Sequence, residues 1–356
     1  MSAEIDGLRW AAYRIPTDGP EADGTLEWDA TTMVVVHATA EGVAGLGWTY
    51  APAAAGHLIG EMLRAHVVGR PAFDVPGLNA AMVRAVRNAG RPGVAGTAVS
   101  AVDTALWDLK ARLLGVRLAT LLGPARPSVP VYASGGFITW DDRRLRSWLD
   151  DNAAIPRAKI KIGGPRDRER TRLLVGSGRE PFVDANGAYT AKRAIRLADE
   201  FPQLRWFEEP VSSDDLDGLR RVRAAVGADV AAGEYGYDLP YFARLLGSVD
   251  CLQADVTRCG GITEWLRVAG LAAAHGLELS GHCAPALHAD AALATPNLRH
   301  LEWFHDHVRI ESMLLDGTTS PGEGGELRPD LSAPGHGLTF KTADAERYLV
   351  AAAPRP

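Results

Sequence analysis

The chain has few cysteines and no long apolar run. Only three of its 356 residues are cysteine (Cys251, Cys259 and Cys283), and no two of them stand in a Cys-x-x-Cys spacing. That pattern is typical of a reducing compartment and argues against a disulfide framework or a zinc site. No stretch of about 18 uncharged apolar residues occurs, which argues against a membrane-spanning helix. The start, MSAEIDGLRW, lacks a basic segment followed by an apolar one, so we expect no secretory signal and a cytoplasmic protein.

The chain also lacks an excess of positive charge. It has 38 basic and 44 acidic residues, a formal net charge of −6. A binding partner such as nucleic acid or an anionic membrane surface requires the opposite balance. We therefore expect a small-molecule partner, with neither nucleic acid nor membrane. The length exceeds one typical core and suggests one large domain with a smaller one.

The first third of the chain predicts strands followed by helices. Residues 31–37 (TTMVVVH) are rich in β-branched side chains, and 42–50 follow a turn-like segment. Residues 97–115 carry apolar side chains at helical spacing and end in glycine. We predict an α+β capping domain over 1–122, completed by the Gly- and Pro-rich segment 315–356, which would pack back on it.

From about Val129 the pattern changes to short apolar strands that alternate with amphipathic helices. Helical stretches such as 262–276 separate the strands, and the one at 166–175 is brief. The predicted strands are 129–134, 158–162, 181–186, 205–210, 229–234, 251–256, 278–283 and 299–303. Eight such strands are what a parallel barrel requires. We predict a (β/α)7β TIM-like barrel over residues 123–314.

Each predicted strand after the first contributes a charged or ionisable residue, and these residues recur at the length of one strand–helix unit. They are Lys161, Asp184, Glu208, Glu234, Asp255, His282 and Glu302, with successive spacings of 23, 24, 26, 21, 27 and 20 residues. Any one of them alone would be read as a solvated strand end. Seven in register predict convergence at the C-terminal mouth of the barrel, where active sites of this architecture lie.

Three of the seven are carboxylates on successive strands. Asp184, Glu208 and Glu234 would repel one another unless a cation held them, and all-oxygen ligation suits Mg²⁺. Neighbours on a strand point to opposite sides, so only one of Glu208 and Glu209 should face the ion. The spacing leaves open which of the two it is.

Two further pairs predict bases. Lys159 and Lys161 stand at i and i+2, so they share one strand face. Each ammonium, together with the metal, should disfavour charge on the other and so lower a lysine pKa toward the range of a base. Asp255 and His282 end the sixth and seventh strands, where a carboxylate can hold an imidazole in one tautomer. The remaining histidines near this region lack such company and are predicted to be structural; they are His288, His305 and His307.

The motifs that contain these residues resemble those of one known family. They are KIK (159–161), FVDANGAYT (182–190), WFEEP (206–210), AGEY (232–235), DVTRCGGITE (255–264), SGHCAP (280–285) and LEW (301–303), and SAVDTALWDLKAR (100–112) precedes them. Together they resemble the mandelate racemase subgroup (mandelate racemase/muconate lactonizing enzyme-like) of the enolase superfamily. The resemblance covers essentially the whole chain.

The resemblance implies a metal site and two bases. Asp184, Glu208 (the first Glu of the EEP motif) and Glu234 would bind one Mg²⁺ per subunit. Lys161 would be one α-proton base, and Lys159 would lower its pKa and touch the substrate carboxylate.

The resemblance also implies roles on the other face and around the pocket. His282, oriented by Asp255, would be the acid or base opposite Lys161. Glu302 would hydrogen-bond the substrate carboxylate in its enolate form. The pocket would be lined by Asn186 and Ser134, and capped by the loop 14–29 together with Trp48 and Tyr50.

The implied reaction is abstraction of the α-proton of a carboxylate substrate by way of a stabilised enediolate. Dehydration of an acid sugar to a 2-keto-3-deoxy acid is the outcome we favour, and the polar residues of 14–29 suit a polyhydroxylated substrate. The alternative is racemisation or epimerisation of a 2-hydroxy or amino acid derivative, which the same two bases permit. The intact set of ligands and bases argues against a non-catalytic binding protein. We also expect a homo-oligomer.

Overall fold

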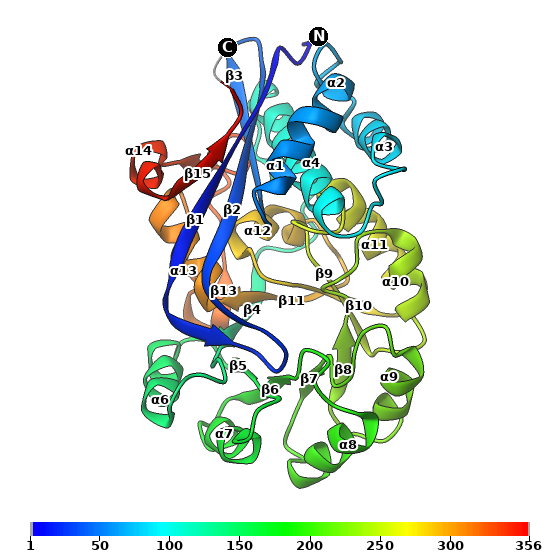
Figure 1. Cartoon of the computed structure of the whole chain (residues 1–356), viewed down its shortest axis with the longest axis vertical. Coiled ribbons are helices and arrows are strands. Elements are labelled where there is room, and N and C mark those ends of the chain that lie inside the picture. Colours follow the sequence, from blue (N-terminus) through cyan, green and yellow to red (C-terminus); the bar gives the residue numbers. More distant parts are fainter. Residues whose placement is uncertain (1–2, 355–356) are drawn as a thin grey trace.

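The N-terminal residues form an antiparallel sheet that the C-terminal end of the chain completes. In the computed structural model, which describes residues 3–354, the sheet order is β15-β1-β2-β3. The strands are β1 (Gly7–Ala22), β2 (Glu27–Ala40), β3 (Val43–Tyr50) and β15 (Leu349–Ala352). Because β15 pairs with β1, the two ends of the chain lie together at the top of Figure 1.

One long helix, α4 (Val94–Leu113), covers this sheet and is almost entirely buried. It packs directly on β3 because two positions there lack a side chain. A Cβ on Gly47 would lie 2.5 Å from the backbone nitrogen of Ala105, and one on Gly45 would meet Leu109 at a similar distance. The shorter helices around it are α1 (Ala54–Leu58), η1 (Ile59–Leu63), α2 (Arg64–Val67), α3 (Val75–Ala85) and α5 (Leu118–Leu122).

The eight strands that follow are all parallel and close into a barrel, which confirms the fold expected from the sequence. Each strand pairs with the next along the chain, and the last pairs with the first. The strands are β4 (Val129–Gly135), β5 (Arg157–Lys161), β6 (Glu180–Asp184), β7 (Trp206–Glu208), β8 (Asp229–Ala232), β9 (Cys251–Ala254), β10 (Glu278–Gly281) and β11 (Leu298–Phe304).

Helices connect successive barrel strands along the described chain. They are α6 (Asp142–Asp151), α7 (Asp167–Val175), α8 (Ala191–Glu200), α9 (Leu216–Arg223), α10 (Leu239–Leu245), α11 (Ile262–Ala274) and α12 (Pro285–Leu293), and α13 (His305–Leu314) follows the last strand. Within the barrel, side chains from several strands pack into one cluster: Tyr132, Phe182, Trp206, Ala231 and Cys251. The interior is thus a packed core, and the polar residues must gather above it.

The segment 14–29 is not a loop, so this prediction was wrong. It forms the far end of a hairpin between β1 and β2, in which Glu21 pairs with Trp28. Irregular pairing between Pro16 and Glu21 accommodates the residues that looked like a loop in the sequence. The tip of the hairpin nevertheless reaches the barrel (Figure 1). The two are so close there that a Cβ on Gly24 would lie 2.7 Å from the carbonyl oxygen of Ala185.

The C-terminal tail contacts both parts of the molecule. Its strand β13 (Glu326–Leu327) pairs with β4 of the barrel, whereas β15 pairs with β1. Between them lie β14 (Thr339–Phe340), which pairs with β12 (Leu315–Asp316), α14 (Thr342–Ala345) and the short helix η3 (Glu346–Tyr348); η2 (Glu323–Gly325) precedes β13. Among residues 3–354 no helix is long and apolar enough to cross a membrane.

Candidate active site

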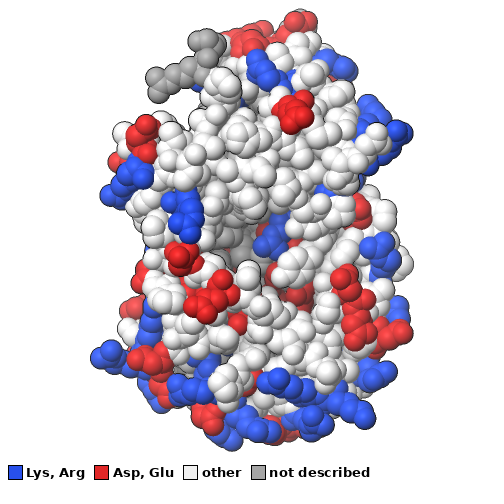
Figure 2. Space-filling model, viewed as in Figure 1, with Lys and Arg blue, Asp and Glu red and all other residues white. Residues whose placement is uncertain are grey.

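The predicted site residues gather at the C-terminal ends of the barrel strands, beneath the N-terminal sheet. Lys159 and Lys161 lie on β5, Asp184 ends β6 and Glu208 ends β7. The other four predicted groups follow or lie on strands β8 to β11: Glu234, Asp255, His282 and Glu302. The space-filling view is hollowed near its centre, between the two parts of the chain (Figure 2).

Three carboxylates form a compact oxygen cluster. Asp184, Glu208 and Glu234 each offer an oxygen, and these oxygens lie within 4.8 Å of one another. All three side chains are buried. Burial raises the pKa of Glu208 to about 8 even though Lys159 opposes the shift. A buried cluster of hard oxygen donors at this spacing fits a hard divalent cation.

Glu208 and Glu209 do not alternate across a strand as we expected. The strand β7 ends at Glu208, and Glu209 takes a left-handed backbone conformation with φ of 36°. Its carboxylate therefore turns toward a cavity of about 590 Å³ that Asn186 and Tyr235 also line. One oxygen of Glu209 is buried with no hydrogen-bond partner, and burial raises the pKa of this carboxyl well above its usual value.

The two lysines lie among the carboxylates. Nζ of Lys159 is 2.5 Å from Glu208 and 2.7 Å from Glu302, and Nζ of Lys161 is 2.6 Å from Asp184. Both lysines are buried. The arrangement confirms that the pair enters the barrel on one face of β5.

The side chains by themselves raise the pKa values of the two lysines, whereas the predicted lowering depends on the metal as well. Burial lowers the pKa of Lys161, and Lys159 lowers it further, but Asp184 and other carboxylates outweigh both. The pKa of Lys161 is therefore raised, as is that of Lys159. Sequence spacing revealed the second ammonium but not how close the carboxylates would lie. A cation held by the same carboxylates would weaken their effect on the lysines.

On the other side of the mouth, His282 is held by Asp255. Nδ1 of His282 lies 2.8 Å from Oδ2 of Asp255, and Nε2 lies 3.2 Å from Glu234. Burial opposes charge on the ring, but Cys283 and Glu234 outweigh it and raise the pKa of His282 well above its ordinary value. Burial likewise opposes ionisation of Asp255, yet His282 lowers the pKa of Asp255 far below the usual range.

Arg258 is a neighbour that the sequence did not single out, although it lies inside the DVTRCGG motif. Its guanidinium is 3.5 Å from Glu234 and 3.6 Å from Asp255, so it lies between the three-carboxylate cluster and the pair of Asp255 and His282. The chain thus places alternating charges around the mouth. No spacing argument pointed to Arg258, because it stands four residues beyond the end of β9 rather than at it.

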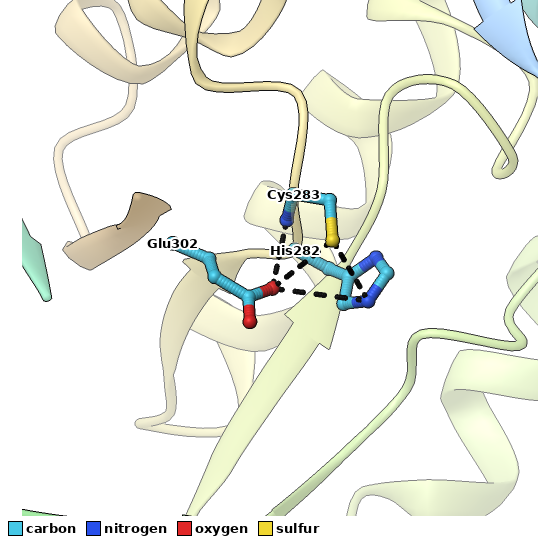
Figure 3. A group of neighbouring side chains, drawn as sticks. All are labelled: His282, Cys283 and Glu302. Atoms are coloured by element: carbon cyan, nitrogen blue, oxygen red, sulfur yellow. Dashed lines mark hydrogen bonds and ion pairs between the residues drawn. The ribbon is translucent and has the colours of Figure 1, made fainter. Parts of the chain in front are cut away.

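Glu302 closes the ring of polar groups. One of its oxygens accepts a hydrogen bond from Ser134 (2.5 Å) and also contacts Lys159. The other accepts a hydrogen bond from the backbone nitrogen of Cys283 at 2.9 Å (Figure 3). Ser134 is therefore at the site, bound to Glu302. Cys283 is a second neighbour that sequence reasoning missed, since its spacing matched no metal motif.

The remaining predicted pocket residues take different positions. The side-chain oxygen of Asn186 is buried without a hydrogen-bond partner beside the 590 Å³ cavity. Tyr50 stacks on His307, with ring centroids 3.5 Å apart. Trp48 is fully buried in the hydrophobic core and lies edge-on to His336. Substrate contact by any of these remains a prediction.

Three histidines predicted to be structural make protein contacts. His288 accepts a hydrogen bond from the backbone nitrogen of Val256 (2.9 Å), and His307 accepts one from the backbone nitrogen of Ala284 (3.2 Å). His305 lies 2.9 Å from Asp18 of the hairpin.

The chain matches two family models, one for each part. The model for the N-terminal domain of mandelate racemase / muconate lactonizing enzyme matches residues 22–123. The model described as enolase C-terminal domain-like matches residues 143–345. The chain belongs to the mandelate racemase/muconate lactonizing enzyme family of the enolase superfamily. The resemblance read from the motifs is thereby confirmed.

Relatives of this family cover nearly the whole chain. A mandelate racemase/muconate lactonizing enzyme-like protein from Rubrobacter xylanophilus is 49% identical, with a TM-score of 0.95 over 98% of this chain and 100% of that one. A racemase from Streptomyces coelicolor A3(2), solved with bound magnesium, is 30% identical, with a TM-score of 0.89 over 97% and 100%. L-talarate/galactarate dehydratase from Salmonella typhimurium (strain LT2) is 32% identical over 78% of this chain and 74% of its own.

Proposed function

We propose that this protein is a Mg²⁺-dependent enzyme that removes the α-proton of an acid sugar and eliminates water to give a 2-keto-3-deoxy acid. One observation carries the proposal: a buried three-carboxylate cluster lies between two candidate bases on different sides of the barrel mouth. Lys161 on β5 contacts Asp184, and His282 after β10 contacts Glu234. Strands β11 and β4 separate β5 from β10 on one side, and β6 to β9 separate them on the other.

The metal would be held by Asp184, Glu208 and Glu234. When bound, Mg²⁺ supplies positive charge where the substrate carboxylate gains negative charge during proton removal. Lys159 would face the same carboxylate. Glu302, as the protonated acid, would donate a hydrogen bond to the enolate form from Oε1, the oxygen that Lys159 and Ser134 now contact. These groups orient the substrate before the proton moves.

Proton transfer is then divided between the two bases. The neutral amine of Lys161 takes the α-proton, and the electron pair forms the enediolate. Protonated His282 gives the proton on Nε2 to the β-hydroxyl, which leaves as water. Asp255 keeps the ring in place, because its carboxylate can only accept and so fixes the hydrogen on Nδ1. The resulting enol takes a proton at C3 to become the 2-keto acid.

The second candidate function is racemisation or epimerisation. It has support from the same pair of bases, because a proton that leaves to Lys161 and returns from His282 inverts the α-carbon. The relative from Streptomyces coelicolor is named a racemase, whereas the relative from Salmonella is named a dehydratase. The hairpin exposes polar side chains, at least in part, at Thr17, Asp18 and Asp23, whereas Glu21 is buried; a polar hairpin over the barrel favours a polyhydroxylated substrate.

A panel of aldonic and aldaric acids, incubated with enzyme and Mg²⁺ in D₂O and followed by NMR, tests the proposal. We expect one or more members to give a 2-keto acid with one deuterium at C3. An epimer with deuterium at C2 and no keto acid would establish the alternative instead. The double variant K161A/H282A gives the background. Absence of both products and of any exchange across the panel would overturn the acid-sugar assignment.

We also propose that the enzyme works as a homo-oligomer in the cytoplasm, in carbohydrate-acid catabolism. The three free cysteines support the compartment, because buried thiols persist in a reducing environment. The strand β15 is an edge strand of the N-terminal sheet, and Val350 on it is 54% exposed. Such an edge can pair with a second copy. Light scattering after size exclusion tests this: a monomeric mass would contradict it.

A further inference from the structure

Cys283 brings a third metal-binding side chain to His282 and Glu302 (Figure 3). Sγ of Cys283 lies 3.3 Å from Nε2 of His282 and 3.4 Å from Oε2 of Glu302. The third distance, from Nε2 of His282 to Oε2 of Glu302, is 3.8 Å. All three side chains are buried, with exposed fractions of 4% or less. None of the three is a member of the carboxylate cluster.

The backbone adopts an uncommon conformation to place this thiol. Cys283 and Ala284 both have positive φ, 52° and 40°, and neither is glycine. Such conformations cost about 1–3 kcal/mol each and persist where surrounding contacts impose them. Here Glu302 accepts a hydrogen bond from the backbone nitrogen of Cys283, and His307 accepts one from that of Ala284. The thiol is therefore aimed at His282 by several independent contacts.

We propose that His282, Cys283 and Glu302 form a second metal site that takes Zn²⁺ and switches the His282 base off. Cysteine, histidine and glutamate are the ligands that zinc prefers, and the soft thiolate discriminates against Mg²⁺. A tetrahedral ion with bonds of about 2.0–2.3 Å separates its ligands by about 3.3–3.7 Å. Pair by pair, such an ion would set sulfur and nitrogen about 3.5 Å apart, sulfur and oxygen about 3.6 Å, and nitrogen and oxygen about 3.4 Å. The observed 3.3, 3.4 and 3.8 Å lie within about 0.5 Å of these values, so small side-chain shifts would complete the site.

Neighbouring groups already orient two of the three ligands for a metal. Asp255 binds Nδ1 of His282 and so leaves Nε2 as the coordinating atom, an arrangement of carboxylate, histidine and metal that recurs in zinc sites. Lys159 and Ser134 both bind Oε1 of Glu302 and leave Oε2 facing the thiol. On binding, the protons of the Cys283 thiol and of Nε2 of His282 pass to the buffer, and zinc–sulfur and zinc–nitrogen bonds replace zinc–water bonds.

The site differs from the carboxylate cluster in its ligands but borders on it. Glu234 of that cluster lies 3.2 Å from Nε2 of His282. Zinc would occupy the lone pair that His282 needs for proton transfer, so excess Mg²⁺ would not restore activity. This inhibitory consequence rests on the proposed function, whereas the binding itself does not. The spacing of the cysteines along the sequence argued against a zinc site, because ligands that are distant in the sequence and close in space do not appear in such a spacing.

Metal binding to the purified protein tests the proposal without a substrate. We would titrate the wild type, C283S and C283A with Co²⁺ and with Zn²⁺ in saturating Mg²⁺, and use C259S as the matched control. Cys259 is also a buried free cysteine, but its Sγ faces the carbonyl oxygen of Gly261. Circular dichroism would verify that each variant is folded.

We expect the wild type and C259S to bind one ion per chain with a thiolate-to-cobalt absorption band. Both Cys283 variants should lose the band and bind zinc at least about tenfold more weakly, since a direct ligand matters no less than an outer-shell partner. Wild-type protein without the band, or Cys283 variants with unchanged zinc affinity, would overturn the site. With a substrate from the panel, zinc should inhibit the wild type and not C283S; inhibition of both would place the inhibitory zinc at the carboxylates and overturn the switch. A thiolate band in an enzyme that is inert toward every acid sugar would refute the proposed function and leave the site established.

Discussion

Nδ1 of His282 lies 2.8 Å from Oδ2 of Asp255, and both side chains are buried. Because burial keeps water from competing for this contact, Asp255 decides which ring nitrogen carries the hydrogen. In the proposed mechanism, the competence of the His282 face therefore depends on Asp255, a residue that need not touch the substrate.

Replacing Asp255 with asparagine should disable the His282 face and leave the Lys161 face working. An amide can donate to Nδ1 and so stabilise the wrong tautomer, a change that costs about 10⁴-fold in enzymes with a comparable pair. We would measure α-proton exchange in D₂O on both epimers of the best substrate. Exchange on the Lys161 face serves as the internal control in D255N, and K161A should show the reverse pattern. Equal loss on both faces in D255N would contradict the division of labour between the two bases.

Removal of the proposed metal ligand at the end of β6, Asp184, should abolish turnover without unfolding the protein. Asp184→Asn halves the oxygen donors of that side chain, and we expect a loss of about 10³-fold or more in kcat because the charge on the substrate carboxylate is no longer neutralised. The circular dichroism spectrum should match that of the wild type, because the residue shapes the mouth rather than the packed barrel core. Full activity of the wild type in excess chelator would refute the metal assignment.

The hairpin residue Glu21 should make stability fall as the pH rises. Its side chain has no exposed surface, and burial, then the nearby Asp306, raise the pKa of Glu21 from its ordinary 4.5 to about 8. Between these two values the unfolded chain has lost the proton while the folded protein keeps it, so the folded state loses stability with increasing pH.

Between pH 5 and pH 8 the wild type should therefore lose roughly 3–4 kcal/mol in the free energy of unfolding that E21Q keeps. Urea unfolding at both pH values measures this. The exposed neighbour Glu27 supplies the control, since E27Q should follow the wild type at both. If the difference in unfolding free energy between E21Q and the wild type were the same at pH 5 and at pH 8, Glu21 would be ionised in the folded protein.

The contact between β3 and α4 should tolerate no side chain at Gly47. A Cβ there would lie 2.5 Å from the backbone nitrogen of Ala105, and neither main chain is free to move. We expect G47A to lose about 3 kcal/mol in the free energy of unfolding. A Cβ on Gly270 of α11 would meet no atom within 4 Å beyond the backbone of its own helix, so G270A should gain up to about 1 kcal/mol from helix propensity. Equal unfolding midpoints for the two variants would contradict the packing argument.

The barrel and most of its polar mouth could be predicted because they depend on local and repeating features. Buried parallel strands must be apolar, and each must end where polar side chains reach solvent or a ligand, so Lys161, Asp184 and Glu208 recur at the length of one strand and helix. Closure of the barrel then brings these residues together whatever the detailed packing. The boundaries of the two predicted domains, the homo-oligomer and the individual substrate contacts stay predictions.

The tertiary structure alone decided the features that depend on how distant segments approach one another. The segment 14–29 extends a hairpin rather than forming a loop, because pairing with β2 compensates for its prolines. Asp184 lies 2.6 Å from Lys161 and raises the pKa of its ammonium, and this distance cannot be read from the spacing along the chain. Cys283 contacts Glu302, 19 residues further along the chain, for two reasons. Strands β10 and β11 are neighbours, and both Cys283 and Ala284 adopt a left-handed backbone conformation. Sequence periodicity determines which residues reach the mouth, whereas charge balance and ligand geometry depend on distances that only the packed chain determines.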